Sequence, residues 1–115
     1  MDSYLIREGD VTLEYYIQGS GDNTLICFHG HGRQVDDFLF LKHIDRKLIL
    51  IVLPHHGNSQ FPTERIETQP LSVTEFSSIF TKILEKEAVG DFHFIGFSQG
   101  GRFVLSLLPL YKNRL

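Results

Sequence analysis

Residues 92–101 constrain the possible folds of this chain more than any other stretch. They read Phe-His-Phe-Ile-Gly-Phe-Ser-Gln-Gly-Gly, and the first four, mostly apolar, predict a short buried strand. A Gly-x-Ser-x-Gly pattern follows over residues 96–100, and apolar residues at helical spacing continue from Gly101 onward. The stretch therefore predicts a strand, a sharp turn and a helix in direct succession, with Ser98 at the turn.

Such a turn suits a reactive serine. It would hold Ser98 in a strained conformation, with the hydroxyl group projecting away from the sheet. Gly96 and Gly100 would let the strand and the helix pass closely, because a Cβ atom at either position would collide with backbone. The first N–H groups of the helix would point toward any negative charge that develops at the serine. The alternative is an ordinary glycine-rich connection between a strand and a helix.

The amino-terminal residues predict a β-hairpin. Strands over residues 3–7 and 11–17 would be joined by residues 8–10, where Gly9 suits a tight turn. The second strand alternates with a period of two, which predicts one buried face and one wetter face. The wetter face would carry Thr12, Glu14, Tyr16 and Gln18.

The middle of the chain predicts two strands, a helix and a loop. Residues 24–28 form a continuous apolar run, typical of a strand covered on both faces, and residues 47–53 give the strongest strand signal. A helix is expected over about residues 35–44, with Phe38, Leu41 and Ile44 or Asp45 along one side. Residues 55–69 are polar and rich in turn formers, so they predict an exposed loop.

A second helix is marked by its start. Residues 72–75, Ser-Val-Thr-Glu, form a capping box, and Leu71 against Phe76 would make a hydrophobic staple. Gly90 is expected to end this helix before the next strand. Five apolar residues at i, i+3, i+4, i+7 and i+8 would face the core: Phe76, Ile79, Phe80, Ile83 and Leu84.

The order of these elements predicts the fold class. A hairpin followed by β-α-β-α-β-α is an α/β fold, in which a mostly parallel sheet carries helices on its faces. The 115 residues suffice for one domain or part of one.

Composition excludes several partners. The net charge of −3, with no basic block, gives no reason to expect nucleic-acid binding. No apolar run approaches the ~20 residues of a membrane span, and the polar start of the chain is not a secretory signal. The single Cys27 cannot form an internal disulfide, which fits a cytoplasmic protein. We expect no cofactor.

Three segments together resemble the α/β-hydrolase fold superfamily. They are Phe-His-Gly-His-Gly at residues 28–32, Leu-Pro-His-His-Gly-Asn-Ser at residues 53–59, and Gly-Phe-Ser-Gln-Gly-Gly at residues 96–101. They occur in the order found in that family. The resemblance implies that residues 1–115 are the N-terminal portion of a single α/β-hydrolase domain, a truncated core of that fold. It also implies a small-molecule ester or acyl substrate.

The resemblance also implies roles for individual residues. Ser98 would be the nucleophile, and the backbone N–H groups of His31 and Gln99 would form the oxyanion hole. His55 stands where the family usually has glycine, whereas His56 and Ser59 would be structural residues of the turn. The family's triad acid and histidine follow the serine in the order Ser, Asp/Glu, His, and neither has a matching position in this chain.

The reaction stays open at this level. The turn at residues 96–101 is similar to that of small carboxylesterases, and the added Arg102 makes it similar to carbon–carbon hydrolases and synthase-like lyases on this fold. Arg102 would contact a carboxylate-bearing substrate or lie at the surface. A second hypothesis is a non-catalytic chain that only binds or self-associates, since the strand at residues 92–95 would form an exposed edge.

Four histidines raise the alternative of a metal site. His29, His31, His55 and His56 would cluster at one edge of the sheet, because they follow two neighbouring strands. No carboxylate or cysteine stands beside them at a regular ligand spacing, and no H-E-x-x-H motif occurs. The sequence therefore favours turn and oxyanion-loop roles over metal binding.

Overall fold

The computed structural model describes residues 2–41 and 43–115, which are built around a five-stranded sheet. The strands lie in the order β1-β2-β4-β3-β5, so β5 occupies one edge. β1, β2 and β4 pair antiparallel, whereas β4, β3 and β5 are parallel to one another. The strand bounds are β1 Asp2–Glu8, β2 Val11–Gln18, β3 Thr24–Phe28, β4 Lys47–Val52 and β5 Phe92–Gly96.

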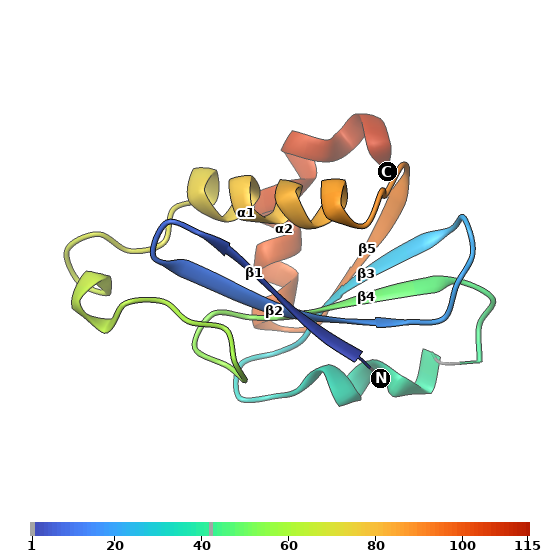
Figure 1. The fold of residues 1–115 in the computed structure, drawn as a ribbon, viewed down its shortest axis with the longest axis horizontal. Helices are drawn as coiled ribbons and strands as arrows, with labels where there is room; N and C mark the ends of the chain where they lie inside the picture. The colour runs from blue at the N-terminus through green and yellow to red at the C-terminus, as the bar shows by residue number, and fades with distance from the viewer. Residues whose placement is uncertain (1, 42) are drawn as a thin grey trace.

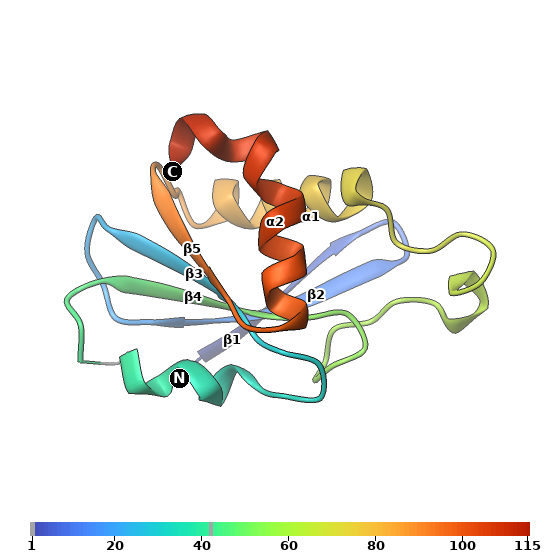
Figure 2. The ribbon, with the colours of Figure 1, turned by 180° about the vertical axis from the view of Figure 1, so that it is seen from behind.

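Two α-helices cover one face of the sheet, and a 3₁₀ helix lies on the other (Figures 1 and 2). The α-helices are α1, Val73–Lys86, and α2, Gln99–Tyr111. The 3₁₀ helix on the opposite face is η1, Val35–Leu41; shorter 3₁₀ turns are η2, Thr63–Arg65, and η3, Lys112–Arg114. This is the predicted α/β architecture, a hairpin followed by alternating strands and helices, with a mixed sheet whose parallel part is β4-β3-β5.

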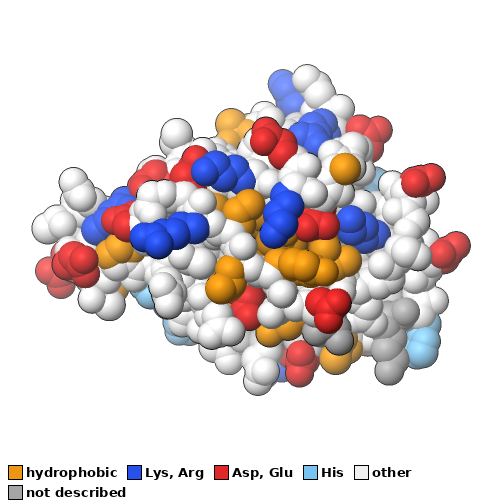
Figure 3. All heavy atoms as spheres, viewed as in Figure 1, with side chains coloured by type: hydrophobic (Ala, Val, Ile, Leu, Met, Phe, Trp, Pro, Cys, Tyr) orange, Lys and Arg blue, Asp and Glu red, His pale blue; other side chains and the backbone are white. Residues whose placement is uncertain are grey.

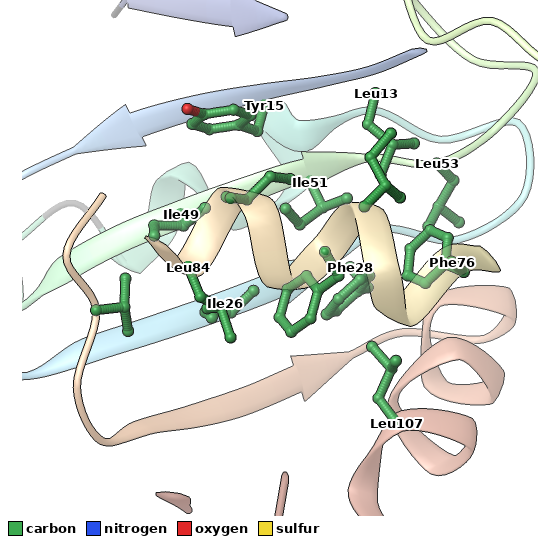
Figure 4. Packing of buried hydrophobic residues seen from close by; sticks show 14 of the residues in the cluster. Leu13, Tyr15, Ile26, Phe28, Ile49, Ile51, Leu53, Phe76, Leu84 and Leu107 are labelled. Carbon is green, nitrogen blue, oxygen red and sulfur yellow. The ribbon is translucent and has the colours of Figure 1, made fainter. Parts of the chain in front are cut away.

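The larger hydrophobic core lies between the sheet and the two α-helices (Figure 4). Phe76 and Leu84 of α1 belong to it together with Ile26, Phe28 and Ile51 of the central strands. Full burial of one such side chain contributes about 1.5–3 kcal/mol. β3 and β4 are covered on both faces, which confirms the prediction made from their continuous apolar runs.

The predicted helix over residues 35–44 is wrong in type and length. The chain forms the 3₁₀ helix η1 there, and Val35 and Phe38 pack into a smaller core on the second face of the sheet. This i, i+3 spacing places both side chains on one side of a helix with three residues per turn. Ile44 is 39% exposed, and Lys42 lies outside the described residues.

The amino-terminal hairpin forms as predicted. Glu8 pairs with Val11, so two residues make the loop, and Gly9 at its first position has φ of +60°. A positive φ at the first central residue is typical of the type II′ turn, which suits the twist of paired strands.

One residue of β2 contradicts the predicted wetter face. Thr12, Tyr16 and Gln18 are half-buried, but Glu14 is only 2% exposed. The loop after β4 covers it, and Asn58 donates two hydrogen bonds to its carboxylate. The wetter face is therefore roofed by a segment that the strand pattern alone does not reveal.

Helix α1 begins as predicted. Ser72 and Glu75 form the complete capping box, and all five predicted apolar residues of the helix are buried. Leu71 is half-buried against the core cluster that contains Phe76, as expected of the staple position.

The end of α1 differs from the prediction. The left-handed residue is Ala88, with φ of +53°, and not Gly90. The Val89 N–H donates to the Leu84 carbonyl at 2.9 Å, and the Ala88 N–H donates to the Glu85 carbonyl at 3.1 Å. These two bonds define a Schellman motif with alanine at the position that glycine usually takes.

The predicted exposed loop over residues 55–69 is partly wrong. Ser59 is 6% exposed and Phe61 is 8% exposed, so both are buried. Gln60, between them, exchanges two backbone hydrogen bonds with Thr12 of β2. The first part of the loop is therefore attached to the sheet, while most residues from 63 to 70 are exposed.

Acidic and basic side chains intermix on the face of the molecule shown in Figure 3. This agrees with the absence of a basic block in the sequence. Within residues 2–41 and 43–115, none of the helices has the length and apolar character needed to cross a membrane.

Candidate active site

The turn between β5 and α2 has the predicted sharp geometry (Figure 2). β5 ends at Gly96, α2 begins at Gln99, and Ser98 between them has φ of 55° and ψ of −115°. A non-glycine residue rarely adopts this conformation, which costs about 1–3 kcal/mol and is typical of functional sites. Ser98 is exposed, and the Phe97 N–H donates to the Phe28 carbonyl at 3.1 Å, which ties the turn to the end of β3.

The two glycines of the motif are required by close backbone approaches. A Cβ atom on Gly96 would lie 2.7 Å from the Gly100 carbonyl oxygen and from the Gly101 Cα atom. A Cβ atom on Gly100 would overlap the carbonyl oxygens of Phe28 and His29. The first glycine therefore lets α2 pass β5, as predicted, and the second lets α2 sit against the end of β3.

The corner after β3 lies against the same turn. The Arg33 N–H donates to the Gly30 carbonyl at 3.0 Å, and Gly32 has φ of +69°. Since His31 has no positive φ, the four residues form a type II turn, which requires φ above zero at its third position. A Cβ atom on Gly30 would lie 3.0 Å from the Phe97 ring, so this corner and the serine turn are in contact.

The structure brings the three predicted site residues to one edge of the sheet. His31 and Gln99 belong to the two loops that meet at Phe97, and Ser98 immediately precedes Gln99. Neither the His31 N–H nor the Gln99 N–H donates a hydrogen bond within residues 2–41 and 43–115. The Ser98 hydroxyl group makes no side-chain hydrogen bond to any described residue, so no imidazole or carboxylate of this part of the chain activates it.

His29 links the ends of two strands. Its ring is 1% exposed, and its Nε2 atom accepts a hydrogen bond from the Leu53 N–H at 2.9 Å. Its Nδ1 atom therefore carries the proton and lies 2.8 Å from the Gly30 carbonyl oxygen. Burial lowers the pKa of His29, which favours this neutral form.

His56 makes the reciprocal link. The Gly32 N–H donates to its Nε2 atom at 2.8 Å, and its Nδ1 atom lies 3.0 Å from the Pro54 carbonyl oxygen. Its ring packs edge-on against His29 and His31, with centroids 4.7 and 5.5 Å apart. Each imidazole thus accepts a backbone N–H from the other loop.

The departure from the family pattern at His55 has a geometric meaning. His55 has φ of +70°, a left-handed conformation that glycine adopts without strain. Its ring packs edge-on against Phe61, with centroids 5.7 Å apart. A histidine therefore occupies here a backbone conformation that glycine adopts most readily.

Glu14 holds the loop after β4 in place, a role that the sequence pattern does not predict. Its carboxylate accepts hydrogen bonds from the backbone N–H and the side-chain amide of Asn58, both at 3.0 Å. Its own N–H donates to Ser59 Oγ at 2.8 Å, and that hydroxyl donates to the Val52 carbonyl at 2.7 Å. Glu14 therefore anchors the loop that carries His56. The sequence does not signal this role, because Glu14 occupies one of the alternating positions of β2 that are expected to face solvent.

A cavity of about 320 Å³ opens beside the first two turns of α2. Gln99 and Arg102 line it, whereas Ser98 does not. Arg102 is exposed and makes no ion pair within residues 2–41 and 43–115, and the Gln99 Oε1 atom is buried with no hydrogen-bond partner among them. The walls are mainly apolar: Pro54, Phe61, Ile66, Pro70, Leu71, Val73, Phe76, Phe103 and Leu107.

The cysteine and the histidine cluster are explained by burial and by hydrogen bonds within the fold. Burial raises the pKa of the Cys27 thiol to about 12, which disfavours a reactive thiolate. In the part of the chain that the structure describes, no three histidine, cysteine, aspartate or glutamate residues are grouped to hold a metal ion. His29 and His56 instead use both ring nitrogens within the two loops.

Comparison with known proteins identifies the fold. No protein-family model matches the sequence, and no curated protein matches it. Solved structures match over nearly the whole chain. Epoxide Hydrolase A from Mycobacterium thermoresistibile matches with a TM-score of 0.79 at 18% sequence identity, covering 99% of this chain and 36% of that one.

Two further structures give the same result. An alpha/beta hydrolase from Novosphingobium aromaticivorans DSM 12444 matches with a TM-score of 0.77 at 18% identity, covering 99% of this chain and 41% of that one. Est816, described as an N-acyl homoserine lactone degrading enzyme, matches with a TM-score of 0.78 at 20% identity, covering 96% and 42%. The chain therefore has the α/β-hydrolase fold, and it spans less than half the length of these three structures.

Proposed function

We propose that Ser98 is the nucleophile of an α/β-hydrolase that cleaves an ester, a thioester or a similar acyl bond. The observation that carries this proposal is the conformation of Ser98, which is strained, exposed and held between β5 and α2. In this arrangement a hydroxyl group can approach a carbonyl carbon, and the start of α2 lies directly behind it.

The backbone N–H groups of His31 and Gln99 form the proposed oxyanion hole. Both lack a hydrogen-bond partner among the described residues, and they belong to loops in contact with each other. An oxyanion that develops on the attacked carbonyl would accept both donors. Removal of one such donor typically lowers kcat by about 100- to 1000-fold.

The proposed substrate is a small molecule with an ester or acyl bond. Est816 is described as degrading a lactone, which is a cyclic ester, and this supports the choice. Arg102 lies at the adjacent cavity without an ion-pair partner in the described residues, so it is the proposed contact for a carboxylate on the substrate. The same residues would also suit a lyase or a transferase that works through an acyl or tetrahedral intermediate.

The proposal places the histidine base and the acid outside residues 1–115. A serine hydroxyl group is a weak nucleophile without an adjacent base, and the described residues provide none at Ser98. Residues 1–115 would thus be the N-terminal portion of one α/β-hydrolase domain and inactive alone. We propose a cytoplasmic location, because the lone Cys27 is a buried free thiol.

Labelling with a fluorophosphonate probe tests the nucleophile. We expect the folded protein, with the complete domain present, to be labelled once, and Ser98→Ala to abolish labelling. Ser20→Ala is the matched control, because Ser20 is exposed in a loop and makes no side-chain hydrogen bond to any described residue. Labelling that persists in Ser98→Ala, or a folded protein that resists the probe, would contradict the proposal.

The second candidate is a non-catalytic chain that binds or self-associates. It is favoured by the position of β5, which pairs only with β3 and therefore leaves one edge open among the described residues. The coding sequence after Leu115 separates the two candidates. A continued frame with an apolar strand, an aspartate and a later histidine supports the hydrolase, whereas a stop codon supports the second candidate.

A further inference from the structure

We propose that His56 is a positioning residue, which sets the orientation of the His31–Gly32 peptide, directly after the peptide that carries the His31 N–H. The inference rests on the proposed function for the catalytic use of the His31 N–H, but the contact itself is independent of any reaction. No motif assigns this role, since His56 lies 24 residues from its partner Gly32.

The type II turn over residues 30–33 can convert to a type I turn by a small local change. Type I and type II turns share the outer hydrogen bond, here from the Arg33 N–H to the Gly30 carbonyl, and differ by a flip of the central peptide plane. The central peptide joins His31 to Gly32. Its N–H is the group that donates to His56 Nε2 at 2.8 Å, so this single bond selects one of the two orientations.

The tautomer of His56 is fixed for this task. The Gly32 N–H can only donate, so Nε2 must present a lone pair to it. The proton of the neutral ring is then on Nδ1, where the Pro54 carbonyl oxygen accepts it at 3.0 Å. The ring is thereby held in the form that accepts at Nε2.

The loop beneath His56 is held by a separate set of contacts. The Glu14 carboxylate receives the backbone N–H and the amide of Asn58, and Ser59 Oγ joins the Glu14 N–H to the Val52 carbonyl. Glu14 and Ser59 are buried, whereas Asn58 is exposed, and hydrogen bonds to a charged group are stronger than those between neutral groups. The loop that carries His56 is therefore held in place, and the His56 ring meets the one peptide of the type II turn that has two alternative orientations.

Protonation would reverse the contact. A proton on Nε2 would face the Gly32 N–H with a second donor and would favour the flipped peptide, whose carbonyl group can accept. The rings of His29 and His31 are the titratable groups packed against His56. Burial lowers the pKa of His29, and the negative charge of Asp37 opposes this shift. No carboxylate of a described residue hydrogen-bonds the His56 ring.

The backbone amides of Gly32 and His31 report the contact directly by nuclear magnetic resonance. At pH 7.5 we expect exchange of the Gly32 amide to be about fivefold or more slower in the wild type than in His56→Ala, as the loss of one ordinary hydrogen bond predicts. The His31 amide resonance should shift in His56→Ala. His56→Gln, whose side-chain oxygen can accept, should retain most of the protection, and His43→Gln, at an exposed histidine, should change neither amide.

An acid titration of the wild type provides the same test without a mutation. The nitrogen resonances of the His56 ring report its protonation. Protection of the Gly32 amide from exchange should disappear over the same pH range. Because this uses the unaltered protein, a failure of His56→Ala to fold does not affect it.

The labelling rate of Ser98 tests the consequence for the site. In the complete domain, His56→Ala should react with a fluorophosphonate about tenfold more slowly, and His56→Gln should be close to the wild type. Amide exchange at Gly32 that is unchanged in His56→Ala would overturn the inference, as would unchanged labelling despite lost protection. A protein that shows the amide effects but no labelling in any form would overturn the proposed function and leave the positioning contact established.

Discussion

Helices α1 and α2 are both preceded by a serine at the N-cap position, and the two hydroxyl groups are used in opposite ways. Ser72 is extended, with φ of −85° and ψ of 161°, and its Oγ atom accepts the Glu75 N–H at 3.0 Å. Ser98 has φ of 55° and ψ of −115°, and its side chain makes no capping hydrogen bond. One serine completes its own helix, whereas the other leaves its hydroxyl group and the first N–H of the helix without partners among the described residues.

The rest of each helix follows the same division. The apolar side of α1 is fully covered, since the five apolar residues predicted to face the core are all buried. In α2, Leu105 is 69% exposed and Leu110 is 56% exposed, although Leu107 is buried. The difference teaches that α1 buries its whole predicted apolar side, whereas α2 combines core side chains such as Leu107 and Tyr111 with a close backbone approach next to the serine turn.

The largest effect should come from the glycine that seats α2. Gly100→Ala should lower the free energy of unfolding by about 3 kcal/mol or more, because the new Cβ atom would overlap two carbonyl oxygens at the end of β3. Gly101→Ala is the matched control, since its nearest neighbour atom would lie at 3.8 Å. Urea denaturation of both variants measures the difference. Equal stability would contradict the close approach described for α2.

The two serines should respond differently to alanine. Ser72→Ala should lose about 1 kcal/mol, because an orphan N–H of α1 loses its acceptor. Ser98→Ala should change the stability by less than about 0.5 kcal/mol, since no capping bond is lost. Thermal or urea denaturation measures both. A comparable loss in the two variants would remove the distinction drawn between the helices.

The end of α1 offers a smaller effect. Ala88→Gly should raise the free energy of unfolding by about 0.5–1 kcal/mol, because glycine adopts the observed φ of +53° without steric cost. Gly90→Ala should cost little in comparison, since a Cβ atom there meets nothing within 4 Å and its φ is not in the left-handed range. The opposite ranking in urea denaturation would favour Gly90 as the end of the helix, as the sequence predicted.

The smallest expected effect is the pH dependence of the α1 cap. The Arg65 guanidinium, followed by the Ser72 backbone N–H, holds the pKa of Glu75 below its ordinary value. A depressed carboxyl pKa contributes stability above the ordinary value of about 4.3, and this contribution is lost as the pH falls through the folded pKa.

Denaturation as a function of pH measures this contribution. The advantage of the wild type over Glu75→Gln should stay below about 1 kcal/mol at pH 7, since the pair is partly exposed, and should vanish in acid. Glu67→Gln controls for the loss of one surface charge. An advantage that persists unchanged in acid would show that the Glu75 charge is not its source.

The features that the sequence predicted correctly depend on neighbours within a few residues. The capping box at residues 72–75, the apolar strands and the strained turn at Ser98 are each specified by a short pattern. The meeting of the His31 corner with the serine turn is a contact between distant segments, and only the resemblance to the α/β-hydrolase family predicted it; in the structure it follows from the parallel pairing of β3 with β5.

The features that the sequence did not predict depend on distant contacts. Glu14 is buried by Asn58, which lies 44 residues away, and His56 accepts from a residue 24 positions earlier. Residues 35–41 form a 3₁₀ helix, in which Val35 and Phe38 are buried in the second core between η1 and the sheet. Ala88 ends α1 because Val89 and Leu84 are both buried when the chain turns there, and composition alone favoured Gly90.

The division of the loop after β4 has a practical consequence. Its first part is bound to β2 through Gln60, whereas residues 66–70 are exposed and precede α1. A protease that cleaves within residues 66–70 would cut the polypeptide into two fragments. The amino-terminal fragment would contain four strands, and the carboxyl-terminal fragment would contain β5 and both α-helices. Pairing of β5 with β3 and the shared core would keep the nicked halves together until denaturant is added.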